Sequence, residues 1–182
     1  MKRLLNQRPI NPLLTGISEN SDMDNLAVQQ AIVLYDRAFR QQLKGNFGEA
    51  ITLYKRSIEL HPTAEAHTFL GWTYSMLDRY DEAIEECKTA IDIDPEYGNP
   101  YNDIGSYLIT LGRPQEAIDW LEKAAKARRY EAPQFPYVNM GRAYELSGRY
   151  RSALEAYDMA LTVDPHYQPA HWAKYALLAR MN

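Results

Sequence analysis

Four segments of this sequence resemble one another, and their spacing constrains the fold more than any other feature. Each segment contains an alanine in a similar context, and these alanines lie 33, 34 and 36 residues apart: Ala50, Ala83, Ala117 and Ala153. A period near 34 is typical of arrays of helix–turn–helix repeats, in which each repeat buries its apolar face only against its neighbours. The apolar/polar alternation typical of strands is absent, so no sheet is expected.

Small residues recur in the first helix of each predicted repeat. They are Ala38, Gly71, Gly105 and Gly141. Glycine inside a helix costs roughly 0.5–1 kcal/mol relative to alanine. A larger side chain in a tight helix crossing costs roughly 1–3 kcal/mol. Because three of four repeats carry glycine at the same place, we expect the two helices of each repeat to pack closely there, with the small residues facing the marker alanines.

Short turns are predicted between the paired helices, and each contains a residue suited to ending a helix. Gly45, Asp78, Gly112 and Gly148 can adopt the left-handed conformation that closes a helix. Pro114 suits the first position of the helix that follows it. The sequence therefore predicts four antiparallel helix pairs.

Together these markers resemble the tetratricopeptide-repeat (TPR) motif over residues 27–165. The resemblance implies an all-α fold, a right-handed TPR superhelix (α-solenoid) of four helix–turn–helix repeats plus a C-terminal capping helix. The expected boundaries are an extended or disordered N-terminal tail at 1–25, repeats at about 26–62, 63–97, 98–131 and 132–165, and the capping helix at 166–182. The third repeat has Arg129 where the motif has its terminal proline.

The predicted last helix, residues 168–180, carries a stripe of apolar residues. Trp172, Tyr175, Ala176 and Ala179 share one face of it. A repeat array needs a cap over its last open apolar edge. We therefore expect this helix to close the array.

Composition and charge limit the classes of partner that the protein can be expected to bind. Apolar residues make up 46% of the 182 residues, which is enough for a sizeable core. The net charge is −4 and basic residues are not clustered, so nucleic acid is not an expected partner. No stretch reaches the ~18 apolar residues that span a bilayer, and the first residues do not form a signal peptide. We expect no membrane partner and a cytoplasmic location.

The sequence gives little support for an enzymatic function. The four histidines show no metal-ligand spacing, and the single cysteine, Cys87, occupies a packing position of the motif. Phosphate-binding loops and nucleophile motifs are absent. A site built from Asp103, Asn139 and Arg142 would lack an evident nucleophile or base. The chain is therefore expected to be no enzyme and to have neither a cofactor nor a metal site.

The resemblance implies that the first helices of the repeats line a concave groove. Apolar groove residues are expected in the first two repeats, namely Tyr35, Phe39, Phe69, Trp72 and Met76. Polar groove residues are expected in the last two, namely Asn102, Asp103, Asn139 and Arg142. Exposed aromatic patches mark binding sites, and asparagine can pair with the backbone of an extended peptide. The leading hypothesis is thus an adaptor or scaffold that binds a partner's peptide or helix.

Several alternatives stay open. The same groove or the C-terminal helix could form a homo-oligomer, and the tail residues Ile10, Leu13 and Leu14 could fill the groove. Small acidic TPR chaperones of bacterial secretion are similar in size and charge, but they usually have three degenerate repeats. Some TPR co-chaperones bind a C-terminal carboxylate through Lys and Asn residues of their repeats. This sequence has other residues at the corresponding positions, so that activity is not implied.

Overall fold

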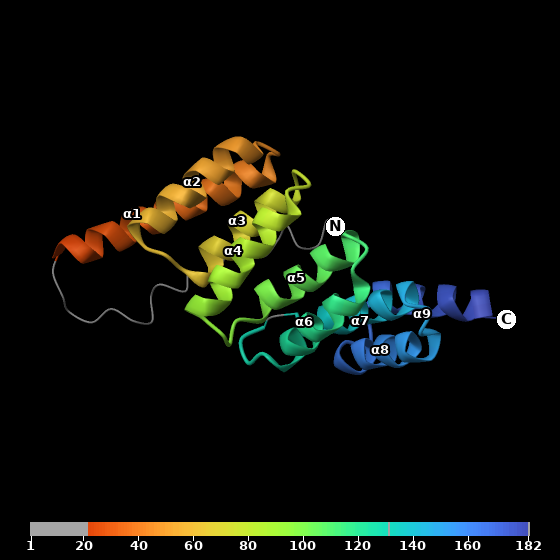
Figure 1. Cartoon of the computed structure of the whole chain (residues 1–182). Coiled ribbons are helices and arrows are strands. Elements are labelled where there is room, and N and C mark those ends of the chain that lie inside the picture. Colours follow the sequence, from red (N-terminus) through yellow and green to blue (C-terminus); the bar gives the residue numbers. More distant parts are fainter. Residues whose placement is uncertain (1–21, 131, 182) are drawn as a thin grey trace. The chain divides into compact units, whose positions relative to one another are not determined.

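The computed structural model describes residues 22–130 and 132–181, and within these ranges the chain forms nine α-helices and no β-strand (Figure 1). The helices are α1 (Asp22–Leu43), α2 (Phe47–Leu60), α3 (Ala64–Ser75), α4 (Tyr80–Ile93), α5 (Gly98–Thr110), α6 (Pro114–Lys126), α7 (Gln134–Leu146), α8 (Tyr150–Val163) and α9 (Gln168–Met181). The all-α prediction is confirmed. The predicted tail lies largely outside the described residues, and α1 begins at Asp22, inside the range assigned to that tail.

The chain falls into two compact units, Met1–Ala90 and Ile91–Asn182. In the first unit α2 packs against both α1 and α3. In the second unit each helix from α5 to α9 packs against the next one along the chain, and α5 also contacts α7. Contact between successive helices is the arrangement that the repeat period predicts.

Left-handed residues stand at the four predicted turns. The backbone φ angle is 80° at Gly45, 56° at Asp78, 72° at Gly112 and 70° at Gly148. Each residue follows the first helix of a pair and reverses the chain into the second. Pro114 is the first residue of α6. The turn predictions are therefore confirmed.

Close packing at the repeated glycines is also confirmed. A Cβ atom at Gly71 would lie 2.8 Å from the Ala83 carbonyl oxygen. At Gly105 and Gly141 the residue that faces the glycine is a large one, a turn beyond the marker alanine. A Cβ atom there would lie 2.5 Å from the Leu121 side chain or 2.2 Å from the Tyr157 ring. Glycine is thus needed at position 71 because the backbone of the second helix lies close, and at positions 105 and 141 because a large residue of the second helix fills the space.

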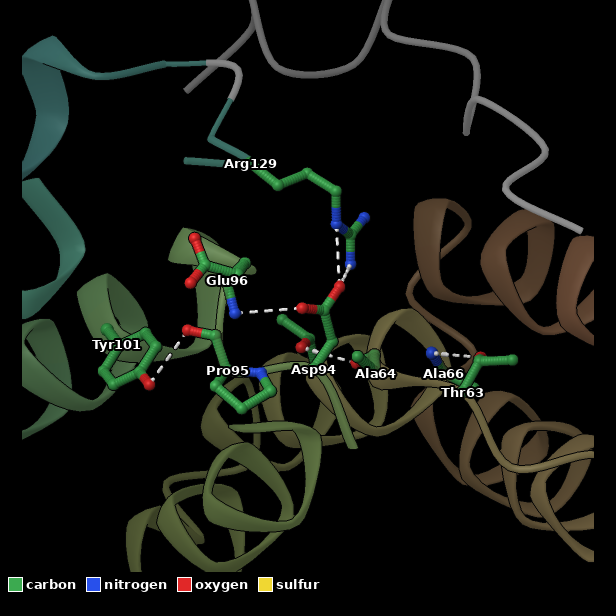
Figure 2. Close-up of polar contacts among 9 residues, drawn as sticks. Thr63, Ala64, Ala66, Asp94, Pro95, Glu96, Tyr101 and Arg129 are labelled. Carbon is green, nitrogen blue, oxygen red and sulfur yellow. Dashed lines mark hydrogen bonds and ion pairs between the residues drawn. The ribbon is translucent and has the colours of Figure 1, made fainter. Parts of the chain in front are cut away.

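At the end of the third repeat, Arg129 connects two loops. The Nε and Nη2 atoms of Arg129 donate to one carboxylate oxygen of Asp94 at 2.9 and 2.6 Å (Figure 2). Its guanidinium group lies 4.1 Å from the centre of the Tyr97 ring. Its backbone nitrogen donates to Glu96 O at 3.0 Å, and its carbonyl accepts from Gly98 N at 2.9 Å. Arg129 therefore fixes the loop after α6 against the loop before α5, where the motif has a proline.

The capping helix α9 packs with the opposite face from the one predicted. Its buried residues are Ala170 and Leu177, and Leu177 joins Ala153 and Tyr157 of α8 in a small core cluster. Trp172 and Tyr175 are 68% and 63% exposed. The prediction that the Trp172 stripe covers the array is therefore wrong. The helix is apolar around most of its circumference, so the sequence pattern alone did not select the packing face.

Candidate partner-binding faces

Five rings from three helices gather in the first unit, and we call them the aromatic cluster: Tyr35, Phe39, Tyr54, Phe69 and Trp72. The centre of the Phe69 ring lies 5.6 Å from Tyr35, 5.5 Å from Phe39, 6.3 Å from Tyr54 and 5.8 Å from Trp72. Most of these pairs meet edge to face, the orientation that aromatic quadrupoles favour. Phe69 of α3 is therefore the centre of the cluster.

The helical spacing explains why the cluster forms. Tyr35 and Phe39 are four residues apart on α1, so both rings lie on one face of that helix. Phe69 and Trp72 are three residues apart on α3. The structure brings together four of the five predicted apolar groove residues. The fifth, Met76, follows the end of α3 and is 38% exposed.

Tyr54 of α2 is the member that the sequence prediction missed. Its ring is fully buried and lies 5.6 Å from Tyr35. Its hydroxyl donates to Gln42 Oε1 at 2.9 Å, and burial together with the nearby Asp36 carboxylate raises the pKa of that hydroxyl. The signal was present, because Tyr54 is the aromatic marker of its second helix. Tyr54 forms the floor of the cluster.

The other rings keep part of their surface open. Tyr35, Phe39, Phe69 and Trp72 are each partly exposed. Rings held by neighbouring rings lose little side-chain freedom when a partner binds them. The alternative that Ile10, Leu13 and Leu14 of the tail cover these rings concerns residues outside those described.

The predicted polar residues form a hydrogen-bonded chain in the second unit. Arg142 Nη1 donates to Asn139 Oδ1 at 3.1 Å, and Asn139 Nδ2 donates to Asn102 Oδ1 at 3.0 Å. Asn102 is buried and bonds the neighbouring Asp103 carboxyl. Burial raises the pKa of Asp103 to about 7, although the bond from Asn102 acts in the opposite direction. All four residues are thus linked, and the two asparagine oxygens are already used within the protein.

An open hollow of about 740 Å³ lies elsewhere in the first unit, between α1 and α2. Leu26, Val33 and Leu60 contribute apolar surface to it, and Arg56 and Glu59 add charges. All three apolar residues are exposed. This hollow was not predicted, since these residues fall outside the repeated motif.

Outside these faces, His67, Glu86 and Cys87 take part in the packing between helices. His67 Nδ1 of α3 lies 2.7 Å from Glu86 Oε2 of α4 and links the two helices. Cys87 is buried. Among the described residues, no group of three or more His, Cys, Asp or Glu side chains could hold a metal ion. A helix long and apolar enough to cross a bilayer is likewise absent from the described part of the chain.

Family models of the tetratricopeptide repeat match residues 64–97, 99–130 and 136–167, which together make up more than half of the chain. Small glutamine-rich tetratricopeptide repeat-containing protein 2 of Mycosarcoma maydis is 34% identical over 101 residues, covering 50% of this chain and 29% of that protein. Anaphase-promoting complex subunit 3 of Schizosaccharomyces pombe is 26% identical over 137 residues, covering 75% of this chain and 20% of that protein. The chain thus spans less than a third of the length of these relatives.

Solved structures of the same repeat architecture align with most of the chain. The crystal structure of MamA aligns with a TM-score of 0.68 and 26% identity, covering 79% of this chain and 84% of that one. The pilF protein of Pseudomonas aeruginosa aligns with a TM-score of 0.78 and 19% identity, covering 87% and 71%. The predicted fold class is therefore confirmed.

Proposed function

The chain belongs to the tetratricopeptide-repeat family, and from that premise we propose that it is a non-enzymatic adaptor that binds a segment of another protein. The observation that carries the proposal is the aromatic cluster. Four of its rings come from the first helices α1 and α3 and remain partly exposed. Interfaces derive most of their binding energy from a few aromatic and arginine anchors of this kind.

The chemistry of the cluster favours bulky apolar side chains in the partner. Burying one such side chain completely contributes roughly 1.5–3 kcal/mol. Phe69 is held by four neighbouring rings, so its position changes little on binding. Trp72 contacts the cluster through Phe69 and extends it toward Met76, whose side chain is exposed. A peptide or helix with two closely spaced apolar anchors fits this surface.

The polar chain offers a second contact of different character. Arg142 is exposed, whereas the Asn102 and Asn139 oxygens already accept hydrogen bonds. The two asparagines therefore position Arg142 and Asp103, and their side-chain oxygens are not the main contacts for a partner. The guanidinium group of Arg142 can donate to backbone carbonyls or a carboxylate of a protein segment that binds the second unit.

Site-specific photo-crosslinking tests the proposal. A photoreactive residue is placed at Met76 of the full chain in the native cell, and a matched control carries it at Val163 of α8, which is 40% exposed and lies outside the cluster and the hollow. We expect a discrete protein adduct from position 76 that the control does not give. Trp72→Ala should reduce its yield. Identical adducts at both positions, or a yield that Trp72→Ala leaves unchanged, would overturn the proposal.

A further inference from the structure

Helix α1 is longer than the first helices of the later repeats. It has 22 residues, whereas α3 has 12 and α5 and α7 have 13 each. Ser57 Oγ of α2 donates to the Ala31 carbonyl oxygen at 2.7 Å, and α2 ends at Leu60. The first turns of α1 therefore extend beyond α2, and they form part of the wall of the hollow between these two helices.

The hollow lies on the side of α1 opposite the aromatic cluster. Leu26, Gln30 and Val33 line it and are four and three residues apart, so they share one face of the helix. Tyr35 of the cluster is nine residues from Leu26, which is about two and a half turns of an α-helix. An occupant of the hollow therefore leaves the aromatic cluster open.

The apolar side chains of the hollow are expected to be covered. Leu26 and Val33 are 53% and 57% exposed, and Leu60 on the α2 side is 40% exposed. A repeat array normally ends in a polar outer face, because no further repeat buries its apolar edge. These three residues leave the outer face of the first repeat partly apolar, which favours a segment that packs against α1 and α2.

We propose that residues 10–14 of this chain bind in the hollow and cover the outer face of the first repeat. Leu14 precedes Asp22, the first residue of α1, by eight positions, so it can lie up to ~26–29 Å from it. Val33 follows Asp22 by eleven positions, about 17 Å along the helix. Gly16 lies in the connecting stretch and permits the chain reversal that this path needs. The segment can therefore reach the whole length of the hollow.

The segment has the residues that such a hollow requires. Ile10, Leu13 and Leu14 supply bulky apolar side chains that can cover the exposed ones of the hollow. Pro12 has a fixed φ, so the segment loses less conformational freedom when it binds. The amide of Gln30 can donate to and accept from the backbone of the segment.

The covalent connection favours this segment over a separate partner. A specific interface between two molecules buries roughly 1,200–2,000 Å², which is more than three half-exposed side chains supply. A short tether holds the segment beside the hollow at an effective concentration on the order of millimolar, so weak contacts are sufficient. The charges also agree, because Arg8 and Glu19 on either side of the segment are opposite in sign to Glu59 and Arg56 of the hollow.

Disulfide formation in the full chain tests this contact. Asn11→Cys with Gln30→Cys places one thiol in the segment and one in the hollow, and every apolar residue stays. Mild oxidation should link these two positions within one chain, while the native Cys87 is buried and stays unreacted. Asn11→Cys with Met76→Cys tests the aromatic cluster as the alternative site, and this bridge should form at least tenfold more slowly. Peptide mapping by mass spectrometry identifies each bridge.

Removal of the apolar anchors separates binding from proximity along the chain. Ile10→Ser with Leu14→Ser keeps the length of the tether, and the bridge between positions 11 and 30 should then form at least fivefold more slowly. Asn6→Ser with Gln7→Ser is the matched control and should leave the rate unchanged. Circular dichroism verifies that all variants stay helical.

The proposal is overturned if no bridge forms between positions 11 and 30, or if the bridge between 11 and 76 forms as fast. It is also overturned if the anchor variant is no slower than its matched control. The inference does not rest on the adaptor function, since the hollow and the aromatic cluster lie on opposite sides of α1. Trp72→Ala should leave the bridge between positions 11 and 30 unchanged, so the two proposals can fail separately.

Discussion

Gly141→Ala should destabilise the protein, although alanine is the better helix former. The new Cβ would lie 2.2 Å from Cε1 of Tyr157, whereas carbon atoms in contact prefer about 3.5–4.0 Å. The ring has little room to move, because Tyr157 is fully buried and its hydroxyl donates to Glu145. Overpacking lowers the free energy of unfolding by roughly 1–3 kcal/mol, and the higher helix propensity of alanine raises it by roughly 0.5–1 kcal/mol. The expected net loss is about 1–2 kcal/mol.

Urea denaturation followed by circular dichroism measures this loss, and Gly48→Ala is the matched control. Gly48 also lies in a helix, but a Cβ atom there would meet nothing within 4 Å. The control should leave the free energy of unfolding unchanged or raise it by up to about 1 kcal/mol. A Gly141→Ala variant as stable as the control would refute the argument that the glycine is kept for close packing.

Three further changes test other parts of the structure by urea denaturation. Asp103→Asn should raise the free energy of unfolding at pH 8. Burial raises the pKa of the Asp103 carboxyl from 3.8 to about 7, so its ionised form destabilises the folded state progressively as pH rises from about 4 to 7. The stability gained by Asp103→Asn should therefore vanish below pH 4. Arg129→Ala should lower the free energy of unfolding by about 1 kcal/mol, since it removes both the Asp94 pair and the Tyr97 contact; an unchanged value would mean that the joint contributes no stability. Asp78→Gly should raise stability by up to about 1 kcal/mol because φ there is 56°, and a loss would show that the aspartate side chain matters more than the backbone.

The sequence predicted the repeat period, the turns and the close glycine contacts because each follows from local constraints. Where α5 and α6 pair, the turn needs a left-handed residue, Gly112, and the close helix contact needs a residue without a side chain, Gly105. The interaction between Arg129 and Asp94 was not foreseen, because it joins two loops 35 residues apart. The sequence showed that Arg129 replaces the proline of the motif, but only the structure showed that it pairs with Asp94 and contacts Tyr97.

The candidate faces were predictable in part. The resemblance to the TPR motif placed Tyr35, Phe39 and Phe69 on the same surface, but it did not show that Tyr54 would form the floor of the cluster. On α9 the apolar residues surround the helix, so its packing face depended on tertiary contacts that no periodicity reveals.

The most direct test of the adaptor proposal is the affinity of the protein for the partner that crosslinking at position 76 identifies. Titration should show that Trp72→Ala weakens binding at least tenfold, about 1.4 kcal/mol, because the partner loses an aromatic anchor. Trp172→Ala, which removes an exposed tryptophan outside the cluster, should leave the affinity unchanged. Equal affinities for wild type and Trp72→Ala, with helicity preserved, would contradict the account.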